Sequence, residues 1–328
     1  MIGGSAGSNA ALKALLAGLP ADMPASLFVA THVPASSGYL AAALARTSPI
    51  PVVAASDGLP IERNRIYVAV PDHHLLVMDG TIRLGDGPRE NMTRPAIDPL
   101  FRSAALSYGP RVIGVVLSGM LNDGASGLWA VKACGGTAVV QHPVDATADQ
   151  MPLAALEAVD ADYVAPADEL ARVLTEIVGR DAGDPATCPD TIELEVRIAA
   201  GARLGSDGLR QLADPSALSC PDCQGVLSEM RDGKPLRYRC QIGHAMTAEV
   251  LASRRDRVDE ALQVAMRMME ERVTLVTRMA VDARRSGRNA VAELYEERAE
   301  EYGRYALTLR EAVNASVRDG GRNQPENA

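Results

Sequence analysis

Ile2-Gly3-Gly4-Ser5-Ala6-Gly7-Ser8 is the stretch that decides the fold. An apolar residue, then glycines, then an Ala/Leu-rich run predicts a short strand that turns directly into a helix. In a parallel sheet such a turn exposes the Ser5 hydroxyl at the carboxyl edge, where ligands bind. The first N–H groups of the helix could receive an oxyanion. The stretch also satisfies the G-x-S-x-G hydrolase pattern, but glycine-rich turns of this kind bind phosphates as well, so the motif alone leaves both functions open.

Runs rich in β-branched residues alternate with Ala/Leu-rich runs over residues 1–178. We expect strands at Ser26–Ala30, Pro51–Ala54, Arg65–Val70, Val112–Ser118, Thr137–Gln141 and Asp162–Ala165. We expect helices at Ser8–Leu19, Ser37–Ala45, Ala96–Tyr108, Gly124–Ala133, Pro152–Val159 and Ala167–Val178. The alternation predicts an α/β domain with a doubly wound, mostly parallel sheet and helices on both faces. Asp79-Gly80, between the apolar runs His74–Met78 and Thr81–Leu84, predicts one local hairpin.

The composition changes after residue 178. Residues 179–189 are rich in Asp, Gly and Pro, which predicts a linker, and a small cysteine-containing module follows at 190–247. Residues 248–317 carry apolar side chains at helical spacing with a break at Ser286-Gly287, which predicts a helical hairpin. We expect residues 318–328 to be disordered. Two roles stay open for the hairpin, which either packs on itself or on the cysteine module, or serves as an arm for self-association or receptor docking.

Length and charge limit the class of protein. The 328 residues are 47% hydrophobic and allow one large core plus a smaller unit. The net charge of -9 argues against nucleic acid as the main partner. The sequence contains no apolar run of about 18 residues, so no membrane helix is expected, and no secretory signal pattern is visible. Five cysteines, an odd number, fit a reducing compartment, so we expect a cytoplasmic protein.

Two further residues are candidates to act with Ser5. His32 follows the second expected strand, and Asp123 follows the strand that ends near Ser118. All three therefore fall at the same sheet edge, where a serine nucleophile needs a neighbouring base and the base needs an orienting carboxylate. Taken singly, His32 could be an ordinary histidine and Asp123 a helix N-cap. Their joint placement favours a Ser-His-Asp triad.

Four motifs carry a resemblance to a known family. They are the run Gly3–Ser8, then Thr31-His32-Val33-Pro34, then Arg94-Pro95-Ala96-Ile97-Asp98-Pro99-Leu100-Phe101, then Leu117–Gly124. In this order they resemble the catalytic domain of CheB-type protein-glutamate methylesterases over residues 1–178. The resemblance implies a doubly wound α/β domain with Ser5 as nucleophile, His32 as general acid/base and Asp123 as the residue that orients His32. The chain order Ser, His, Asp also differs from that of ordinary α/β-hydrolases.

The resemblance implies hydrolysis of glutamate methyl esters on chemoreceptor-like proteins, with glutamine deamidation as a related activity. Backbone amides of Ala6 and Met120 are our candidates for the oxyanion site, and no catalytic cofactor is expected. Arg94 could contact substrate, although a structural pair with Asp98 is favoured. At the nucleophile the family's Ser-Thr-Gly-Gly is replaced by Ser5-Ala6-Gly7-Ser8. The family's receiver domain is not expected ahead of Ser5.

Three of the five cysteines form a metal-binding pattern together with a histidine. Cys220-x2-Cys223 and Cys240-x3-His244, separated by sixteen residues, match the ligand spacing of a structural zinc ribbon. Four protein ligands leave no position for a catalytic water, so this site would be structural. Similar tails occur on some methylesterases that lack the receiver domain. Cys134 is interpreted as a small core residue and Cys188 as a linker thiol.

Other functions stay in view. The alternative to an esterase is a zinc and helical scaffold with a weak or inactive esterase domain, and a small-molecule esterase is a minor third candidate. His73, His74 and His142 lie next to strands and are interpreted as structural. The expected partner is a methylated chemoreceptor or a similar signalling protein, with no nucleic acid and no membrane insertion.

Overall fold

The structure is a computed structural model that describes residues 1–32, 40–184, 186–253 and 256–320. These fall into two compact units, Met1–Leu251 and Ala252–Ala328. The cysteine-containing segment expected at residues 190–247 thus lies in the same unit as the expected catalytic domain. Residues 37–39 of one expected helix, and most of the expected disordered tail, lie outside the described residues.

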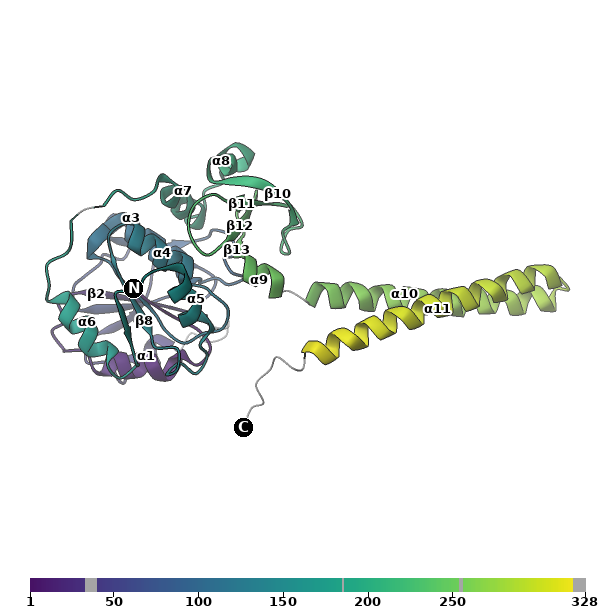
Figure 1. Cartoon of the computed structure of the whole chain (residues 1–328), viewed down its shortest axis with the longest axis horizontal. Helices are drawn as coiled ribbons and strands as arrows, with labels where there is room; N and C mark the ends of the chain where they lie inside the picture. The colour runs from purple at the N-terminus through teal and green to yellow at the C-terminus, as the bar shows by residue number, and fades with distance from the viewer. Residues whose placement is uncertain (33–39, 185, 254–255, 321–328) are drawn as a thin grey trace. The chain divides into compact units, whose positions relative to one another are not determined.

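Seven parallel strands form the central sheet of the first unit (Figure 1). In spatial order they are β3 (Val52–Ala54), β4 (Arg65–Val68), β2 (Ser26–Thr31), β1 (Ile2–Gly4), β7 (Ile113–Val116), β8 (Thr137–Gln141) and β9 (Tyr163–Ala165). β1 pairs with β2 on one side and with β7 on the other. The chain winds outward from β1 in both directions, so the doubly wound parallel sheet predicted from sequence is confirmed and its topological switch point is at β1.

Helices cover both faces of this sheet (Figure 1). One face carries α1 (Ser8–Ala17), α2 (Leu40–Ala45) and α6 (Leu170–Val178), with Leu15, Leu44 and Leu174 buried in a shared core. The other face carries α3 (Ile97–Tyr108), α4 (Ala125–Ala133), α5 (Gln150–Ala158) and α7 (Asp190–Ala199). A short 3-10 helix, Gly109–Arg111, follows α3. Phe101 and Leu128 lie in the core of this second face, which also takes up Val196 from α7.

The expected hairpin is confirmed. β5 (His74–Met78) pairs antiparallel with β6 (Thr81–Gly85). Asp79 and Gly80 both have positive φ, 48° and 74°, which is the backbone of a type I′ turn. This turn type matches the twist of the two strands and explains why Asp-Gly is a strong signal for it.

A four-stranded antiparallel sheet follows α8 (Gly205–Leu212). Its strands are β10 (Ala213–Ser219), β11 (Val226–Met230), β12 (Arg237–Cys240) and β13 (Ala245–Thr247), in that spatial order. We call this sheet with its turns, residues 213–247, the cysteine module. α9 (Ala248–Ser253) follows directly. The turns β10–β11 and β12–β13 carry the two pairs of expected metal ligands.

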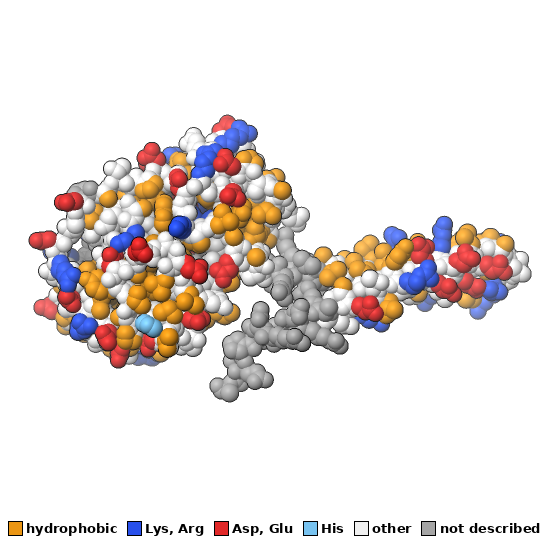
Figure 2. Space-filling model, in the orientation of Figure 1, with side chains coloured by type: hydrophobic (Ala, Val, Ile, Leu, Met, Phe, Trp, Pro, Cys, Tyr) orange, Lys and Arg blue, Asp and Glu red, His pale blue; other side chains and the backbone are white. Residues whose placement is uncertain are grey.

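Two long helices make up the second unit (Figure 1). α10 (Asp256–Arg285) and α11 (Asn289–Gly320) lie side by side, and Gly287 between them has a φ of 73°. The break predicted at Ser286-Gly287 is confirmed. Arg284 joins the helices by donating to Glu296 at 2.8 and 2.6 Å. Figure 2 shows hydrophobic side chains mixed with acidic and basic ones along the hairpin.

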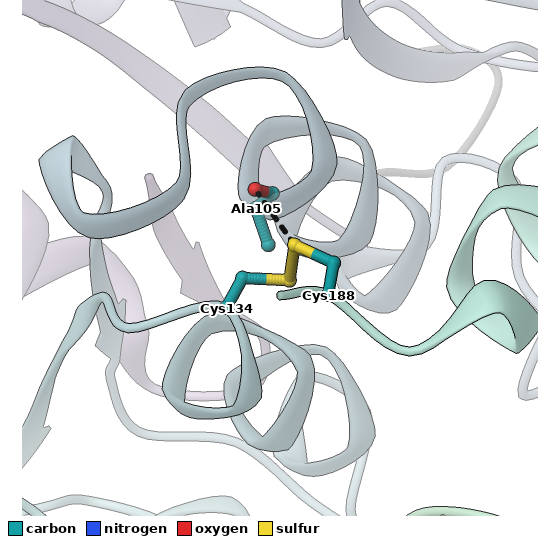
Figure 3. Close-up of a disulfide and its surroundings, with 3 residues drawn as sticks. All are labelled: Ala105, Cys134 and Cys188. Carbon is teal, nitrogen blue, oxygen red and sulfur yellow. Dashed lines mark hydrogen bonds between the residues drawn. A yellow bond between two sulfur atoms is a disulfide. The ribbon is translucent and has the colours of Figure 1, made fainter. Parts of the chain in front are cut away.

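One expectation about the cysteines is wrong. Cys134 is buried in the core as predicted, but it forms a disulfide with Cys188, which was expected to be a free linker thiol. Figure 3 shows the bond at the end of α4, beside the carbonyl of Ala105 on α3. The segment before α7 returns to this face of the sheet and brings two residues 54 positions apart to a Cα–Cα distance of 4.6 Å. Chain spacing gives no sign of that approach.

Candidate active site

The register of β1 and β2 brings the first two candidates together. Gly4 pairs with Thr31, so Ser5 and His32 are the next residues on neighbouring strands. Ser5 Oγ lies 3.0 Å from His32 Nδ1. The turn after Ser5 requires glycine, because Gly7 has a φ of 74° and a Cβ there would lie 2.4 Å from Thr147 Cβ. The strand-turn-helix predicted from sequence therefore places a serine hydroxyl against an imidazole.

Asp123 completes a chain of hydrogen bonds. Its Oδ2 lies 2.6 Å from His32 Nε2 and also accepts from the backbone N–H of Ile97 at 2.7 Å. Its Oδ1 accepts from Asn91 Nδ2 at 2.9 Å and from the N–H of Gly124 at 3.1 Å. Burial favours the neutral acid, but the bond and charge of His32 together with these donors lower the pKa of Asp123.

The ionised state of Asp123 fixes the histidine tautomer. A carboxylate surrounded by donors can only accept, so His32 Nε2 carries the proton that lies between them. His32 Nδ1 is then a lone pair that faces the Ser5 hydroxyl and can take its proton. The structure thus brings Ser5, His32 and Asp123 into the arrangement of a nucleophile, a base and an orienting carboxylate.

A second buried carboxylate lies beside the first. Asp98 accepts from Asn91 Nδ2 at 2.9 Å and from the N–H groups of Gly124 and Gly127 at 3.0 and 2.6 Å. Burial and the neighbouring Asp123 charge raise the pKa of Asp98 to about 7. Asp98 therefore joins α3 to the start of α4, directly behind the candidate triad.

The favoured pair of Arg94 with Asp98 is wrong. Arg94 donates to Asp72 Oδ1 at 3.2 and 2.7 Å and to the carbonyls of Asp86 and Gly87 at 3.2 and 2.9 Å. Asp98 faces inward from the first turn of α3, whereas Arg94 precedes the helix and turns outward. With these partners Arg94 holds the loop before α3, and within the part of the chain that the structure describes it makes no contact with the candidate triad.

The two backbone amides chosen for an oxyanion site lie next to Ser5. Ser5 N donates to Ser118 O at 2.9 Å, and a Cβ at Gly119 would come within 3.0 Å of Ser5 Cβ. Among the described residues, neither Ala6 N nor Met120 N has a hydrogen-bond acceptor. Met120 as a whole residue is 52% exposed.

Ser8, a departure from the family pattern, has a defined place. Its side chain is buried and donates from Oγ to Ser5 O at 2.7 Å. A Cβ at Gly4 would lie 2.6 Å from Ser8 Cβ, so a side chain at Ser8 is accommodated because Gly4 has none. The added hydroxyl braces the nucleophile turn from behind.

The other histidines near strands bind backbone or surface groups. His74 is buried, and its ring lies 2.9 Å from Pro88 O and 3.3 Å from Ala96 N, which fits a neutral ring that donates at Nε2 and accepts at Nδ1. Burial lowers the pKa of His74 and agrees with that assignment. His73 pairs with Asp86 at 3.2 Å, and His142 Nδ1 accepts from Val144 N. These contacts fit the structural role inferred from sequence.

The four expected metal ligands converge at one end of the cysteine module. The ligand atoms of Cys220, Cys223, Cys240 and His244 all lie within 4.8 Å of one another. Cys223 Sγ is 3.6 Å from Cys240 Sγ, and His244 Nδ1 is 3.8 Å from Cys220 Sγ and 3.5 Å from Cys240 Sγ. Zn–S bonds of about 2.3 Å at tetrahedral angles put two sulfurs about 3.8 Å apart. The donor set and its spacing therefore fit a tetrahedral zinc ion.

A large cavity of about 820 Å³ lies elsewhere in the first unit. Residues at or just before the amino ends of the strands line it, among them Met1, Ser26, Val112 and Thr137. Ser5 and His32 follow the carboxyl ends of their strands, so this cavity is at the opposite edge of the sheet from the candidate triad.

Several residues around the triad had no signal in the sequence. Asn91 contacts both buried aspartates, and Asn122 accepts from Thr247 Oγ1 at 2.7 Å. Behind them, Glu90 and Glu195 are buried with three arginines, Arg102, Arg237 and Arg239. Glu and Arg are common surface residues, and nothing in their spacing marked these five as a buried cluster.

The family model described as CheB methylesterase matches residues 1–174. This chain belongs to the CheB methylesterase family. The match covers the parallel-sheet domain and the strand ends that carry Ser5, His32 and Asp123, and it confirms the resemblance drawn from the four motifs.

Relatives of the CheB family match over the same region. A protein of Anaeromyxobacter dehalogenans named protein-glutamate methylesterase/protein-glutamine glutaminase 2 is 40% identical over 180 residues, which are 54% of this chain and 52% of that protein. A protein of the same name from Methanosarcina mazei is 33% identical over 54% of this chain and 51% of its own length. The chain thus spans about half the length of these curated relatives.

A solved structure confirms the fold of the matched region. The crystal structure of the Thermotoga maritima CheB methylesterase catalytic domain superposes with a TM-score of 0.52 at 33% identity. The superposition covers 54% of this chain and 96% of that domain. Among the residues that the structure describes, no helix is both long and apolar enough to cross a membrane.

Proposed function

We propose that this chain is a serine esterase that hydrolyses glutamate 5-methyl esters on chemoreceptor-like proteins. The observation that carries the proposal is the continuous hydrogen-bond chain from Ser5 Oγ through the His32 ring to Asp123, at the switch point of a CheB-family sheet. The names of the relatives support the substrate class. Deamidation of receptor glutamines is part of the proposal, because amide and ester carbonyls undergo the same acyl transfer.

The acylation step follows from the tautomer. His32 Nδ1 takes the Ser5 proton while Oγ attacks the ester carbonyl, and the imidazolium that forms is stabilised by the buried Asp123 carboxylate. We assign the tetrahedral oxyanion to the backbone amides of Ala6 and Met120. The carbonyl then re-forms, the C–O bond to the methoxy group breaks, and His32 returns the proton to the departing oxygen as methanol leaves.

Deacylation reverses these roles with water. His32 removes a proton from water, the resulting hydroxide attacks the acyl-Ser5 ester, and Ser5 regains its proton as the product acid leaves. The product is a receptor glutamate. With a glutamine substrate the first leaving group would be ammonia, and the product would again be glutamate.

The cysteine module is proposed to hold a structural zinc ion. Cys220, Cys223, Cys240 and His244 would bind it, and the spacing of their donor atoms fits tetrahedral coordination. The ion would join the β10–β11 turn to the β12–β13 turn and so stabilise the small sheet. With four protein ligands it would leave no open position for a substrate.

Methanol release from methylated chemoreceptor tests the esterase proposal. We expect the full chain to release methanol and Ser5→Ala to lose several powers of ten in rate, because the nucleophile acts as a unit with its base. Ser8→Gly is the comparison variant: it removes the hydroxyl that binds Ser5 O but keeps the nucleophile, so it should lose far less rate than Ser5→Ala. A folded wild-type chain with no Ser5-dependent release would contradict the proposal and favour the scaffold alternative.

A further inference from the structure

The last strand of the cysteine module borders the loop before α3. Asn91 N donates to Ala245 O at 2.8 Å, and Thr247 N donates to Asn91 Oδ1 at 3.3 Å. The backbone and the side chain of Asn91 are thus both bound to β13. Asn91 and Met92 also have positive φ, 47° and 66°, which are unfavourable for non-glycine residues and persist where surrounding contacts hold them.

These contacts decide which way the Asn91 amide faces. Because its Oδ1 accepts from Thr247 N, its Nδ2 faces the two buried carboxylates. There it donates to Asp123 Oδ1 and to Asp98 Oδ2, each at 2.9 Å. A residue of the cysteine module therefore orients the amide that binds the triad carboxylate.

Thr247 reaches the triad by a second route. Its Oγ1 donates to Asn122 Oδ1 at 2.7 Å, and Asn122 Nδ2 donates to Glu249 Oε2 at 2.8 Å. Asn122 is 2% exposed and immediately precedes Asp123. The loop that carries the triad carboxylate is thus fixed at Asn122 by Thr247 and by a side chain from α9.

The buried ion cluster holds this contact from behind. Glu90, next to Asn91, accepts from Arg102 of α3 and from Arg239 of β12, the latter at 3.0 Å. Glu195 of α7 accepts from Arg239 at 2.8 Å. The cluster joins the module to the sheet domain at buried positions, so the contact between them is part of the core.

We infer that the cysteine module is a structural part of the esterase site, with Thr247 and Asn91 as positioning residues that hold Asp123 against His32. This inference rests on the proposed function and extends it to a region outside the family match, which ends at residue 174. A truncated or loosened module would leave Ser5 and His32 in place but release the carboxylate that sets the His32 tautomer.

The test compares Thr247→Val, which keeps the volume but loses the hydroxyl, with Thr247→Ser, which keeps it. Thr137→Val, at the opposite edge of the sheet, is the control. Thr247→Val loses the neutral hydrogen bond to Asn122, which predicts a kcat lower by about two- to tenfold with KM unchanged. Asn91→Ala removes a bond to a charged group and predicts a loss of about tenfold to hundredfold. Thr247→Ser and Thr137→Val should keep the wild-type kcat.

A second readout does not depend on turnover. The ¹⁵N shifts of the neutral His32 ring, assigned with His32→Gln, report which nitrogen carries the proton. The wild-type chain should show the Nε2–H form, and Thr247→Val and Asn91→Ala should show a mixture. An unchanged tautomer in both variants would overturn the inference, as would a rise in KM alone. If the wild type has no Ser5-dependent release, the proposed function fails and the tautomer by itself decides the positioning role.

Discussion

Replacing Glu195 by leucine should destabilise the first unit strongly. Glu195 is 1% exposed and accepts from Arg237 at 2.7 and 3.0 Å and from Arg239 at 2.8 Å, with Arg102 Nη1 at 3.4 Å. In Glu195→Leu this cluster of described residues would keep three guanidinium groups and one carboxylate, Glu90, so its buried charge would rise from +1 to +2. Removing one partner of a buried ion pair costs about 3–5 kcal/mol, because the other charge stays buried without compensation.

Urea unfolding of the full chain measures this cost. The matched control is Asp214→Asn, which removes the exposed pair with Arg231 and should cost less than about 1 kcal/mol. The slope of the free energy of unfolding against urea should be similar in all three proteins, so that a change in midpoint reports stability. A Glu195→Leu protein as stable as the wild type would refute the claim that this cluster needs both of its acids.

The cost should also depend on pH. Burial opposes ionisation of Glu195, but the three arginines and their hydrogen bonds hold its pKa well below the usual value of 4.5. A lowered folded pKa stabilises the protein above the unfolded pKa, and this stabilisation is lost as the pH falls through the folded value. The difference between wild type and Glu195→Leu should therefore be constant at neutral pH and shrink below about pH 4.5.

Three other predictions concern single groups. The pKa of Asp98 is raised to about 7. The wild type should therefore lose stability relative to Asp98→Asn as the pH rises from about 4 to 7, with no further change above pH 7. Melting temperatures that differ by the same amount at every pH would contradict this prediction. Denatured but unreduced protein should show three thiols and reduced protein five, and five thiols before reduction would exclude the disulfide. Cys188→Ser should lose up to about 4 kcal/mol of stability, because the disulfide joins residues 54 positions apart. Metal analysis of washed, folded protein should find about one zinc per chain, and Cys223→Ser should lower it; a metal-free folded chain would refute the zinc site.

The candidate triad could be predicted from the sequence because local patterns determine where its residues lie. Ser5 and His32 each directly follow a strand that the sequence predicts, and in a parallel sheet the ends of neighbouring strands meet at one edge. The register of Gly4 with Thr31 then leaves little freedom for the two side chains. Asp123 was harder, since it stands seven residues beyond β7, but its motif supplied the missing constraint.

The contacts that support the candidate triad could not be predicted from local sequence patterns. Asn91 and Thr247 lie 156 residues apart, and no periodicity relates them. Arg94 and Asp98 were expected to pair at the opening of a helix, yet Arg94, which stands before α3, binds Asp72 instead. The Cys134–Cys188 disulfide was not predicted for the same reason as the Asn91 contact: both depend on how a later segment of the chain returns to the sheet.

The two ends of the candidate triad have different surroundings, and this bears on how the proposed esterase could be controlled. Among the described residues Ser5 is half-buried and Ala6 is exposed, and Met120 near them is 52% exposed. Asp123 is 2% exposed and accepts from the starts of α3 and α4 and from Asn91, which the cysteine module binds in turn. A module that covered Ser5 would compete with every substrate, whereas one that holds Asp123 can change the rate without touching the entrance. Any ligand or protein that shifted β13 would therefore be expected to alter kcat and leave substrate binding unchanged.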